Sequence, residues 1–190
     1  YGASGSSDGH NVAVGMETMD ALTTGSYNIA RGGQSQGAAT TADYNVSMGY
    51  RSLYTATTGG LNVAIGHKAL LLNTTASNNV AVGYLALDAN TTGESNVALG
   101  SGNALGANTT GSNNTALGQA TLTLNTTGHS NIGIGTAALE ANTTGTNNVA
   151  VGMQSLDAAT TALDNTAVGK SALGACTTGS YNTALGKNDA

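Results

Sequence analysis

Residues 79–95 read NVAVGYLALDANTTGES, and variants of this stretch fill almost the whole chain. The pentapeptide Asn-x-x-x-Gly that opens it recurs every 17 residues, with one step of 18 between Asn96 and Asn114. A Thr-Thr pair follows in each full copy. A period of this length, sustained from Asn11 to the last residues, indicates a repeat architecture rather than a conventional domain.

The pattern within each repeat predicts the fold. In Asn79-Val80-Ala81-Val82-Gly83 the side chains alternate as in a short strand, with the valines on one side and Ala81 on the other. A Leu four residues after the Gly indicates a second short strand, and Gly, Asn and Thr-Thr-Gly mark turns. We therefore expect an all-β protein, a parallel β-solenoid or β-roll of about eleven 17-residue coils. Helical repeats are longer, roughly 30 residues or more, and are excluded.

The repeats also divide the chain. Residues 1–10 are expected to be a partial coil or an N-terminal cap, residues 11–181 ten repeats of 17 or 18 residues, and residues 182–190 a partial final coil. The extra residue falls in segment 101–103, where we expect a bulge in a loop. Because the chain opens with Tyr1 rather than Met, we expect it to be a processed product or part of a longer protein.

Stacked coils about 4.8 Å apart would turn each repeated position into a column along the axis. We place the Val, Ile and Leu residues of the pentapeptide inside the coil, together with the later Leu, and the Ala on the outer side. About three such side chains, each worth roughly 1.5–3 kcal/mol, do not offset the ordering of a coil at roughly 1–2 kcal/mol per residue. An outward Ala suits close approach by another chain, so we predict self-association, as a homotrimer. A monomer whose Ala stripe faces water is the alternative.

The repeated Asn, Gly and Thr positions predict structural columns that join neighbouring coils. Representative members are Asn62, Asn79, Asn96, Gly66, Gly83, Gly100, Thr91 and Thr92. A second set of asparagines matches the N-glycosylation motif: Asn73, Asn90, Asn108, Asn125 and Asn142. Glycans on asparagines about 4.8 Å apart would collide, which favours an internal asparagine column.

The second repeat departs from the pattern twice. Arg31 stands at an expected inward apolar position, and Gln36 replaces the Leu. We expect both side chains to face each other inside the coil, where a guanidinium requires polar partners. Two interpretations stay open: an anion or polar core site, with three Arg31 side chains around a symmetry axis, or a locally wider and wetter coil.

Other polar and aromatic residues give weaker signals. Tyr27 and Tyr44 are equivalent in successive repeats, so they could bind a sugar ring or simply cover a turn. His10, His67 and His129 occupy unrelated repeat positions and predict no metal cluster. The acidic residues are scattered, and we find no catalytic constellation.

Composition narrows the function further. Five Lys and Arg against ten Asp and Glu give no basic footprint for nucleic acid. No apolar run approaches the roughly 20 residues of a membrane span. The single cysteine, Cys176, excludes an intrachain disulfide framework and a thiolate zinc site. We expect no cofactor, no metal and no enzymatic activity.

Asn62-Val63-Ala64-Ile65-Gly66 and its relatives resemble the head repeats of trimeric autotransporter adhesins. The longer unit, as in residues 125–135, is similar to shaft repeats of phage tail fibres and bacterial surface proteins. The resemblance implies a left-handed β-roll, three chains around one axis, and attachment to a surface. The period of 17 residues is longer than that of the adhesin repeat.

These observations favour a structural fibre segment, a shaft or an adhesive head, that is extracellular, on a cell surface or on a virion. Its expected partners are copies of itself and a cell-surface glycan or receptor. One alternative is a subunit of a head-to-tail extracellular filament. Two others are an ice-binding protein, suggested by the Thr-Thr pairs, and a polysaccharide-acting enzyme. Adjacent threonines in an extended segment point to opposite faces, which argues against a flat ice-binding array.

Overall fold

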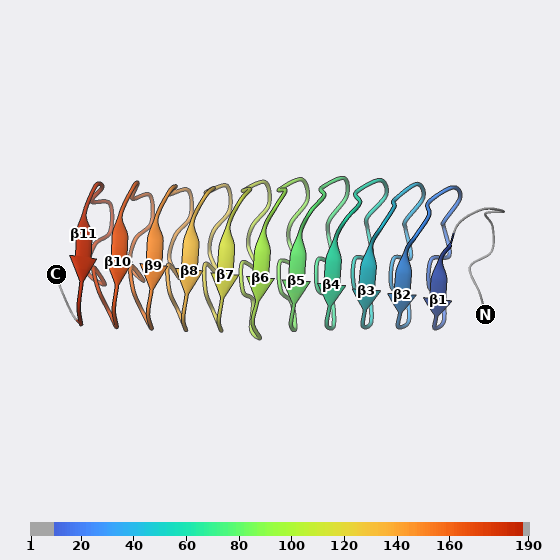
Figure 1. Ribbon diagram of the computed structural model, residues 1–190, viewed down its shortest axis with the longest axis horizontal. Helices are drawn as coiled ribbons and strands as arrows, with labels where there is room; N and C mark the ends of the chain where they lie inside the picture. Colours follow the sequence, from blue (N-terminus) through green and yellow to red (C-terminus); the bar gives the residue numbers. More distant parts are fainter. Residues whose placement is uncertain (1–9, 188–190) are drawn as a thin grey trace.

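The computed structural model describes residues 10–187, in which each repeat contributes one strand of three residues. The eleven strands lie side by side in chain order, from β1 at one end of the molecule to β11 at the other (Figure 1). Every neighbouring pair is parallel, and the described residues contain no helix, so the predicted all-β parallel solenoid is confirmed. The strands are β1 (Val12–Val14), β2 (Ile29–Arg31), β3 (Val46–Met48), β4 (Val63–Ile65), β5 (Val80–Val82), β6 (Val97–Leu99), β7 (Thr115–Leu117), β8 (Ile132–Ile134), β9 (Val149–Val151), β10 (Thr166–Val168) and β11 (Thr183–Leu185).

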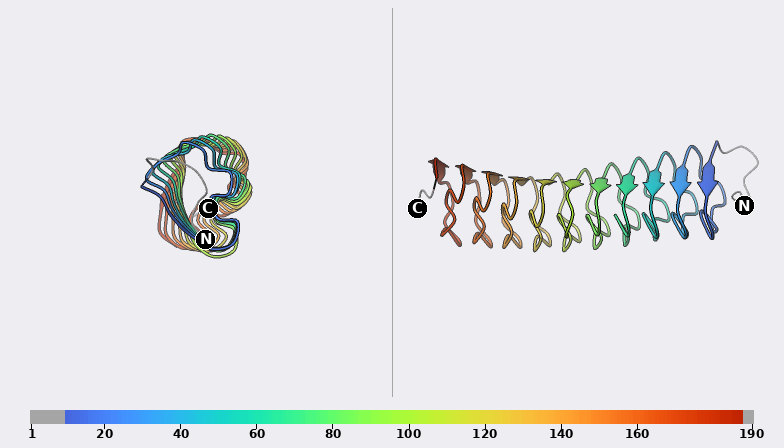
Figure 2. Two further views of the ribbon diagram at one scale, coloured as in Figure 1. Left: turned by 90° about the vertical axis from the view of Figure 1, so that its right-hand side faces the viewer. Right: turned by 90° about the horizontal axis from the view of Figure 1, so that it is seen from below.

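Equivalent residues of successive repeats lie directly opposite one another. Ala81 of β5 is aligned with Ala64 of β4 and with Ala98 of β6. The register is kept across the longer step, where Ala98 is aligned with Ala116 of β7, because the extra residue lies in the bend at 101–103, outside the strands. Viewed along the axis, the coils superimpose with a gradual rotation (Figure 2). Like side chains therefore form columns along the molecule.

The expected cap at residues 1–10 and the last part of the final coil fall largely on residues 1–9 and 188–190, which lie outside the described residues. The described part of the final repeat begins at Asn182 and includes β11.

The part of each coil that follows the strand consists of turns, so the prediction of a second strand is wrong. The backbone still bonds along the axis there, as in the 3.0 Å hydrogen bond from the Leu70 amide to the Ala86 carbonyl. In each full repeat, however, three residues other than glycine have positive φ, and in the fourth coil these are Lys68 (57°), Leu70 (54°) and Asn78 (62°). Left-handed residues cannot continue an extended strand.

The side chains of each strand face the opposite way from our expectation. The central alanines, such as Ala64 and Ala81, are fully buried, whereas the flanking Ile65 and Leu99 are 37% and 39% exposed. The prediction of inward valines and an outward Ala stripe is therefore wrong. The predicted Leu column is confirmed, because it is buried along the molecule at Leu53, Leu70, Leu87, Leu105, Leu122, Leu139, Leu156 and Leu173.

A narrow interior explains why the small residue points inward. In the eighth coil Gly133 takes the place of the strand Ala, and a Cβ there would lie only 2.6 Å from the Cγ2 of Thr121. Thr121 itself stands where the neighbouring coils have Ala104 and Ala138. One larger side chain is thus matched by one smaller neighbour, as expected where the interior volume is fixed.

Candidate functional site

The first and third residues of strands β1–β11 form a continuous surface, which we call the outer sheet face. Its members are almost all Val, Ile, Leu, Met or Thr, and many large ones are more than a third exposed. Examples are Val12, Ile29, Met48, Ile65, Leu99, Ile132 and Ile134. Arg31 is the single charged residue among the strands. Because strands β1–β11 lie in one sheet, this apolar face runs the length of the described rod.

Arg31 and Gln36 lie on opposite sides of the coil wall, so they do not form the expected internal pair. Arg31 is the third residue of β2 and is exposed, because third residues point outward in every strand. Gln36 is fully buried. Its Nε2 donates to the Ser47 hydroxyl at 2.8 Å and to the Ile29 carbonyl at 3.4 Å. The Gln36 Oε1 has no hydrogen-bond donor among the described residues.

Serines surround Gln36 and divide the apolar core. The Ser35 hydroxyl lies 2.6 Å from that of Ser47 and 3.0 Å from that of Ser52. One apolar cluster, which includes Met19, Ala30 and Ala42, lies in the first two coils, and the larger cluster starts at Leu53. The second and third coils therefore contain a polar core section, but the guanidinium is not part of it.

The opening asparagines of the repeats form the first asparagine column, which includes the predicted Asn62, Asn79 and Asn96. The Asn79 backbone amide donates to the Asn62 Oδ1 at 3.0 Å, and that of Asn96 donates to the Asn79 Oδ1 at 2.9 Å. The Asn79 Nδ2 donates to the Gly93 carbonyl at 2.9 Å. Each buried amide thus joins two coils and also links the start of its own coil to its end.

The five asparagines of the glycosylation motif form the second asparagine column, which is fully buried. The Asn90 Nδ2 donates to the Asn73 Oδ1 at 3.1 Å and to the Gly93 carbonyl at 2.9 Å. The same pattern continues to Asn142, whose Oδ1 has no donor among the described residues because Ala159 follows it in the next coil. These side chains are internal and are not accessible to a glycan.

The predicted glycines and threonines lie in the wall of the coil. Gly66 and Gly83 have φ of 134° and 136°, and a Cβ on Gly83 would overlap the Gly100 carbonyl oxygen. The Thr91 hydroxyl donates to the Thr109 carbonyl at 3.0 Å. Thr92 is exposed. In the pairs from Thr40 to Thr161 the second threonine is the more exposed one, whereas both threonines are exposed in the end pairs, Thr23-Thr24 and Thr177-Thr178.

An aromatic column that the sequence analysis did not identify lies on the turn after the strands. The His67 ring stacks between Tyr50 and Tyr84, with ring centroids 5.7 and 5.5 Å away. The Arg51 guanidinium carbon lies 5.4 Å from the Tyr50 centroid and 5.2 Å from that of Tyr54. Each such cation–π contact contributes about 0.5–1 kcal/mol at an exposed site. The shared repeat position of Tyr50, His67 and Tyr84 could have predicted the column.

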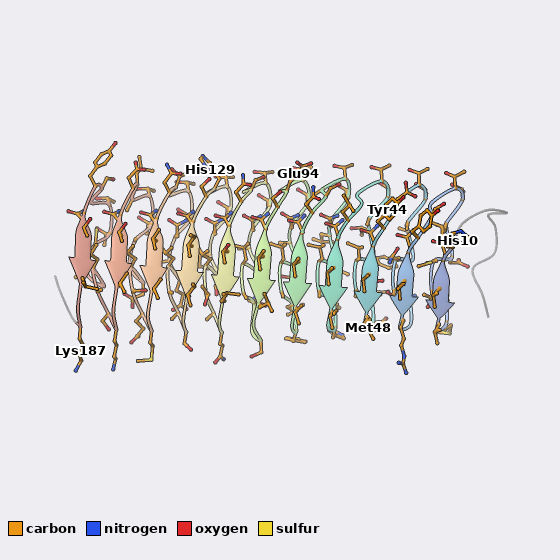
Figure 3. The ribbon with its side chains drawn as sticks, in the orientation of Figure 1. His10, Tyr44, Met48, Glu94, His129 and Lys187 are labelled. Carbon is orange, nitrogen blue, oxygen red and sulfur yellow. The ribbon has the colours of Figure 1, made fainter. Side chains whose placement is uncertain are left out.

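The predicted tyrosine pair lies on the opposite edge of the rod. Tyr27 and Tyr44 stack with centroids 4.9 Å apart and an interplanar angle of 2°, and His10 tilts against Tyr27. Figure 3 shows Tyr44, Glu94 and His129 on the edge that precedes the strands. Lys187, which shares the repeat position of Tyr50, lies on the other edge (Figure 3).

The remaining titratable residues form no metal-binding cluster within residues 10–187. No group of three or more His, Cys, Asp or Glu side chains could hold a metal ion there. Burial raises the pKa of the half-buried Asp88 carboxyl, while backbone hydrogen bonds and the nearby Lys68 ammonium partly oppose that rise. Cys176 is half-buried, and its thiol lies 3.4 Å from the Gly179 carbonyl oxygen.

Comparison with known proteins adds no assignment: no family model, no curated protein and no solved structure matches this chain. Between residues 10 and 187 there is also no helix long and apolar enough to cross a membrane.

Proposed function

We propose that this chain is a structural segment of an extracellular or virion fibre, in which copies pack through their outer sheet faces as a homotrimer. The fibre would serve in attachment to a surface or in display. The observation that carries the proposal is the continuous apolar outer sheet face.

The size of the outer sheet face supports an interaction surface. Eleven strands about 4.8 Å apart, each three residues of about 3.3 Å long, make a strip of roughly 50 by 10 Å. Exposed Leu61, two residues before β4, widens it. Contiguous apolar patches of more than a few hundred Å² mark interaction sites on soluble proteins. Burial of this strip would add stability that the narrow coil interior does not supply.

A second copy of the chain is the partner that fits the strip best. Side chains on the outer sheet face repeat at the strand spacing along the whole sheet. A partner stays in register with them over that length only if its own side chains repeat at the same strand spacing. Another copy of the chain has this spacing because it has the same fold. Parallel packing would place the Arg31 side chains of all copies at one level, where they repel one another unless an anion binds between them.

The test is the native mass of the purified chain and of two variants. Val82→Asp combined with Leu99→Asp places two carboxylates on the outer sheet face, and Thr92→Asp places one on the exposed threonine column. We expect a trimer for the wild type and for Thr92→Asp, and a monomer for the double variant, with circular dichroism showing that all three fold. A monomeric wild type, or a double variant that remains trimeric, would contradict the proposal.

Two further measurements separate the alternatives. Electron microscopy of the wild type should show discrete short rods, whereas micrometre-long fibres would favour the head-to-tail filament.

Arg31→Val should raise the thermal midpoint of a parallel trimer, because it removes charges held at one level. An unchanged midpoint would favour an arrangement that keeps the arginines apart.

A further inference from the structure

We infer that the turn edge of the third to fifth coils binds an acidic saccharide, with Arg51 holding the carboxylate and the Tyr50–His67–Tyr84 column contacting the sugar rings. This inference rests on the attachment function proposed above and specifies the class of ligand. It is supported by the fixed position of Arg51, by the free donors of its guanidinium and by the arrangement of the rings.

Arg51 is held in place but keeps free hydrogen-bond donors. Its guanidinium lies against the Tyr50 and Tyr54 rings, and its Nε donates to the Gln34 Oε1 at 2.5 Å. The Gln34 Nε2 in turn donates to the Glu17 carboxylate. Among the described residues, no group accepts a hydrogen bond from the two terminal nitrogens of Arg51. A planar guanidinium with both terminal nitrogens free is suited to a bidentate contact with a carboxylate.

Glycines of the preceding coil lie under both tyrosines beside Arg51. A Cβ on Gly37 would lie only 2.8 Å from the Tyr54 Cε2, so Gly37 makes room for that ring, whereas a Cβ on Gly33 would make an ordinary contact with the Tyr50 Cδ2 at 3.5 Å. Both rings therefore lie over backbone that carries no side chain. The tyrosines and the glycines together fix the orientation of the guanidinium before a ligand arrives.

The other end of the aromatic column offers a ring to solvent. Tyr84 is 54% exposed. One face of its ring stacks on His67, and the next residue at the same repeat position is the small Ser101, beside the bend at 101–103. Aromatic side chains present an apolar surface next to a polar group, which suits the apolar face of a sugar ring with its hydroxyls.

Positive charge on this edge is concentrated at Arg51. Glu17, Gln34, Arg51 and Lys68 occupy one repeat position in successive coils, so Gln34 separates Arg51 from the Glu17 carboxylate. The Asp88 carboxyl lies near the Lys68 ammonium and offsets part of its charge. Lys68 follows Arg51 at the same repeat position in the next coil, so two cations lie on the same turn edge. The Tyr27–Tyr44 stack has no Lys or Arg in its own turn. A neutral sugar could use the rings and hydrogen-bond to Arg51, but only an acidic one would form a bidentate ionic contact with its guanidinium.

The experiment titrates the full-length chain with matched pairs of oligosaccharides in a calorimeter. One pair is trigalacturonate and its methyl ester, and the other is sialyllactose and lactose. We expect at least one acidic member to bind and its neutral counterpart to bind tenfold more weakly or not at all. Arg51→Gln should weaken binding of the acidic member at least tenfold, and Tyr84→Ala should weaken it several-fold.

Two matched variants control for charge and for aromatic area. Lys170→Gln removes a cation at the Tyr50 repeat position in a distant coil, and Tyr181→Ala removes a tyrosine that is 79% exposed. Both should bind like the wild type. The inference is overturned if neither acidic saccharide binds at millimolar concentration, if Arg51→Gln binds like the wild type, or if inorganic sulfate binds as tightly as the saccharide.

Cell attachment distinguishes failure of this inference from failure of the proposed function. If the wild-type chain attaches to a cell surface and Arg51→Gln attaches equally well, the saccharide site is wrong and the fibre function stands. If the wild-type chain neither assembles nor attaches, the proposed function itself is wrong.

Discussion

Side-chain amides are buried both in the middle coils and in the second coil, but the Gln36 amide of the second coil lacks a partner for its oxygen. Asn90 and Asn108 donate to the amide oxygen of the preceding coil and to a glycine carbonyl of their own coil. Gln36 in the second coil is equally buried, but its neighbours at the same position are Met19 and Leu53, which cannot donate to its Oε1. In these coils the oxygen of a buried side-chain amide thus receives a hydrogen bond when the next coil has the same residue type at that position.

The unpaired buried oxygens of the described residues follow the same rule. They are the Gln36 Oε1, the Asn142 Oδ1 at the end of the second asparagine column, and the Thr123 Oγ1. Thr123 stands between Gly106 and Glu140 at its repeat position. Each one lies where a column changes residue type. The free-energy cost of unpaired buried oxygens therefore arises at the ends of a polar column and at isolated polar residues. It does not increase with the length of the column.

Exchanging Leu and Gln at this position between a middle coil and the second coil should give the largest effect on the free energy of unfolding. Leu87→Gln buries an amide among alanines and leucines with no serine to bond it, and should destabilise the chain by about 3 kcal/mol. Gln36→Leu removes an amide with an unpaired oxygen and makes the apolar column continuous. It should leave the free energy of unfolding unchanged or raise it by about 1 kcal/mol. Equilibrium denaturation in urea measures both.

The two changes should therefore differ in sign, although each alters one side chain at the same repeat position. If Gln36→Leu destabilised the chain as much as Leu87→Gln, the serines around Gln36 would depend on it, and the second coil would be a satisfied polar network.

Interrupting the second asparagine column in its middle or at its end, in two separate variants, should give a smaller difference in the free energy of unfolding. Asn108→Ala leaves the Asn90 Oδ1 without a donor and adds a second unpaired oxygen to the column. Asn142→Ala removes one unpaired oxygen and creates another at Asn125, so their number is unchanged. Asn108→Ala should be the more destabilising change, by about 1–2 kcal/mol, since an unsatisfied buried group costs about 1–3 kcal/mol.

The two substitutions are matched, because both replace Asn with Ala and both sites precede a glycine by three residues. Equal losses in thermal or chemical denaturation would show that the cost is not concentrated at the ends of the column.

The position of each strand could be predicted from the sequence, but the direction its side chains face could not be predicted from alternation alone. Val80-Ala81-Val82 alternates equally well with either side inward. Variation among the repeats carries the missing signal. The central position accepts only Ala, Ser47 or Gly133, whereas the third position accepts Arg31, Met48, Ile65 and Val82. A position restricted to the smallest side chains faces the narrow interior, and one that accepts arginine faces solvent.

The candidate site was harder to predict for a different reason. The internal asparagines repeat at a fixed spacing and could be identified from the sequence. The Tyr50–His67–Tyr84 column mixes residue types, and its Arg51 contact depends on the rings of Tyr50 and Tyr54, which lie over glycines of another coil. Repetition in the sequence shows which residues stack, but not which way a long side chain turns on the surface.

The smallest expected effect comes from Asp88, a middle-coil acid with Leu71 and Gly106 at its repeat position in the neighbouring coils. Burial raises the pKa of its carboxyl in the folded chain, so the folded state binds the proton more tightly than the unfolded state does. The stability of the wild type should therefore fall, relative to Asp88→Asn, as the pH rises from below the carboxyl's unfolded pKa through its folded value. Because Asp88 is only half-buried, the difference at pH 7 should be a few tenths of a kcal/mol.

Denaturation of the wild type and Asp88→Asn at several pH values measures this difference, with Asp157→Asn, at the same repeat position in the ninth coil, as the control. A wild type that gains stability relative to Asp88→Asn as the pH rises would mean that the Lys68 ammonium and the backbone hydrogen bonds outweigh burial. The Asp88 carboxylate would then be stabilised by groups of neighbouring coils, although those coils have no Asp at the same position. A polar side chain that reaches the surface would therefore not need the same residue type in the next coil.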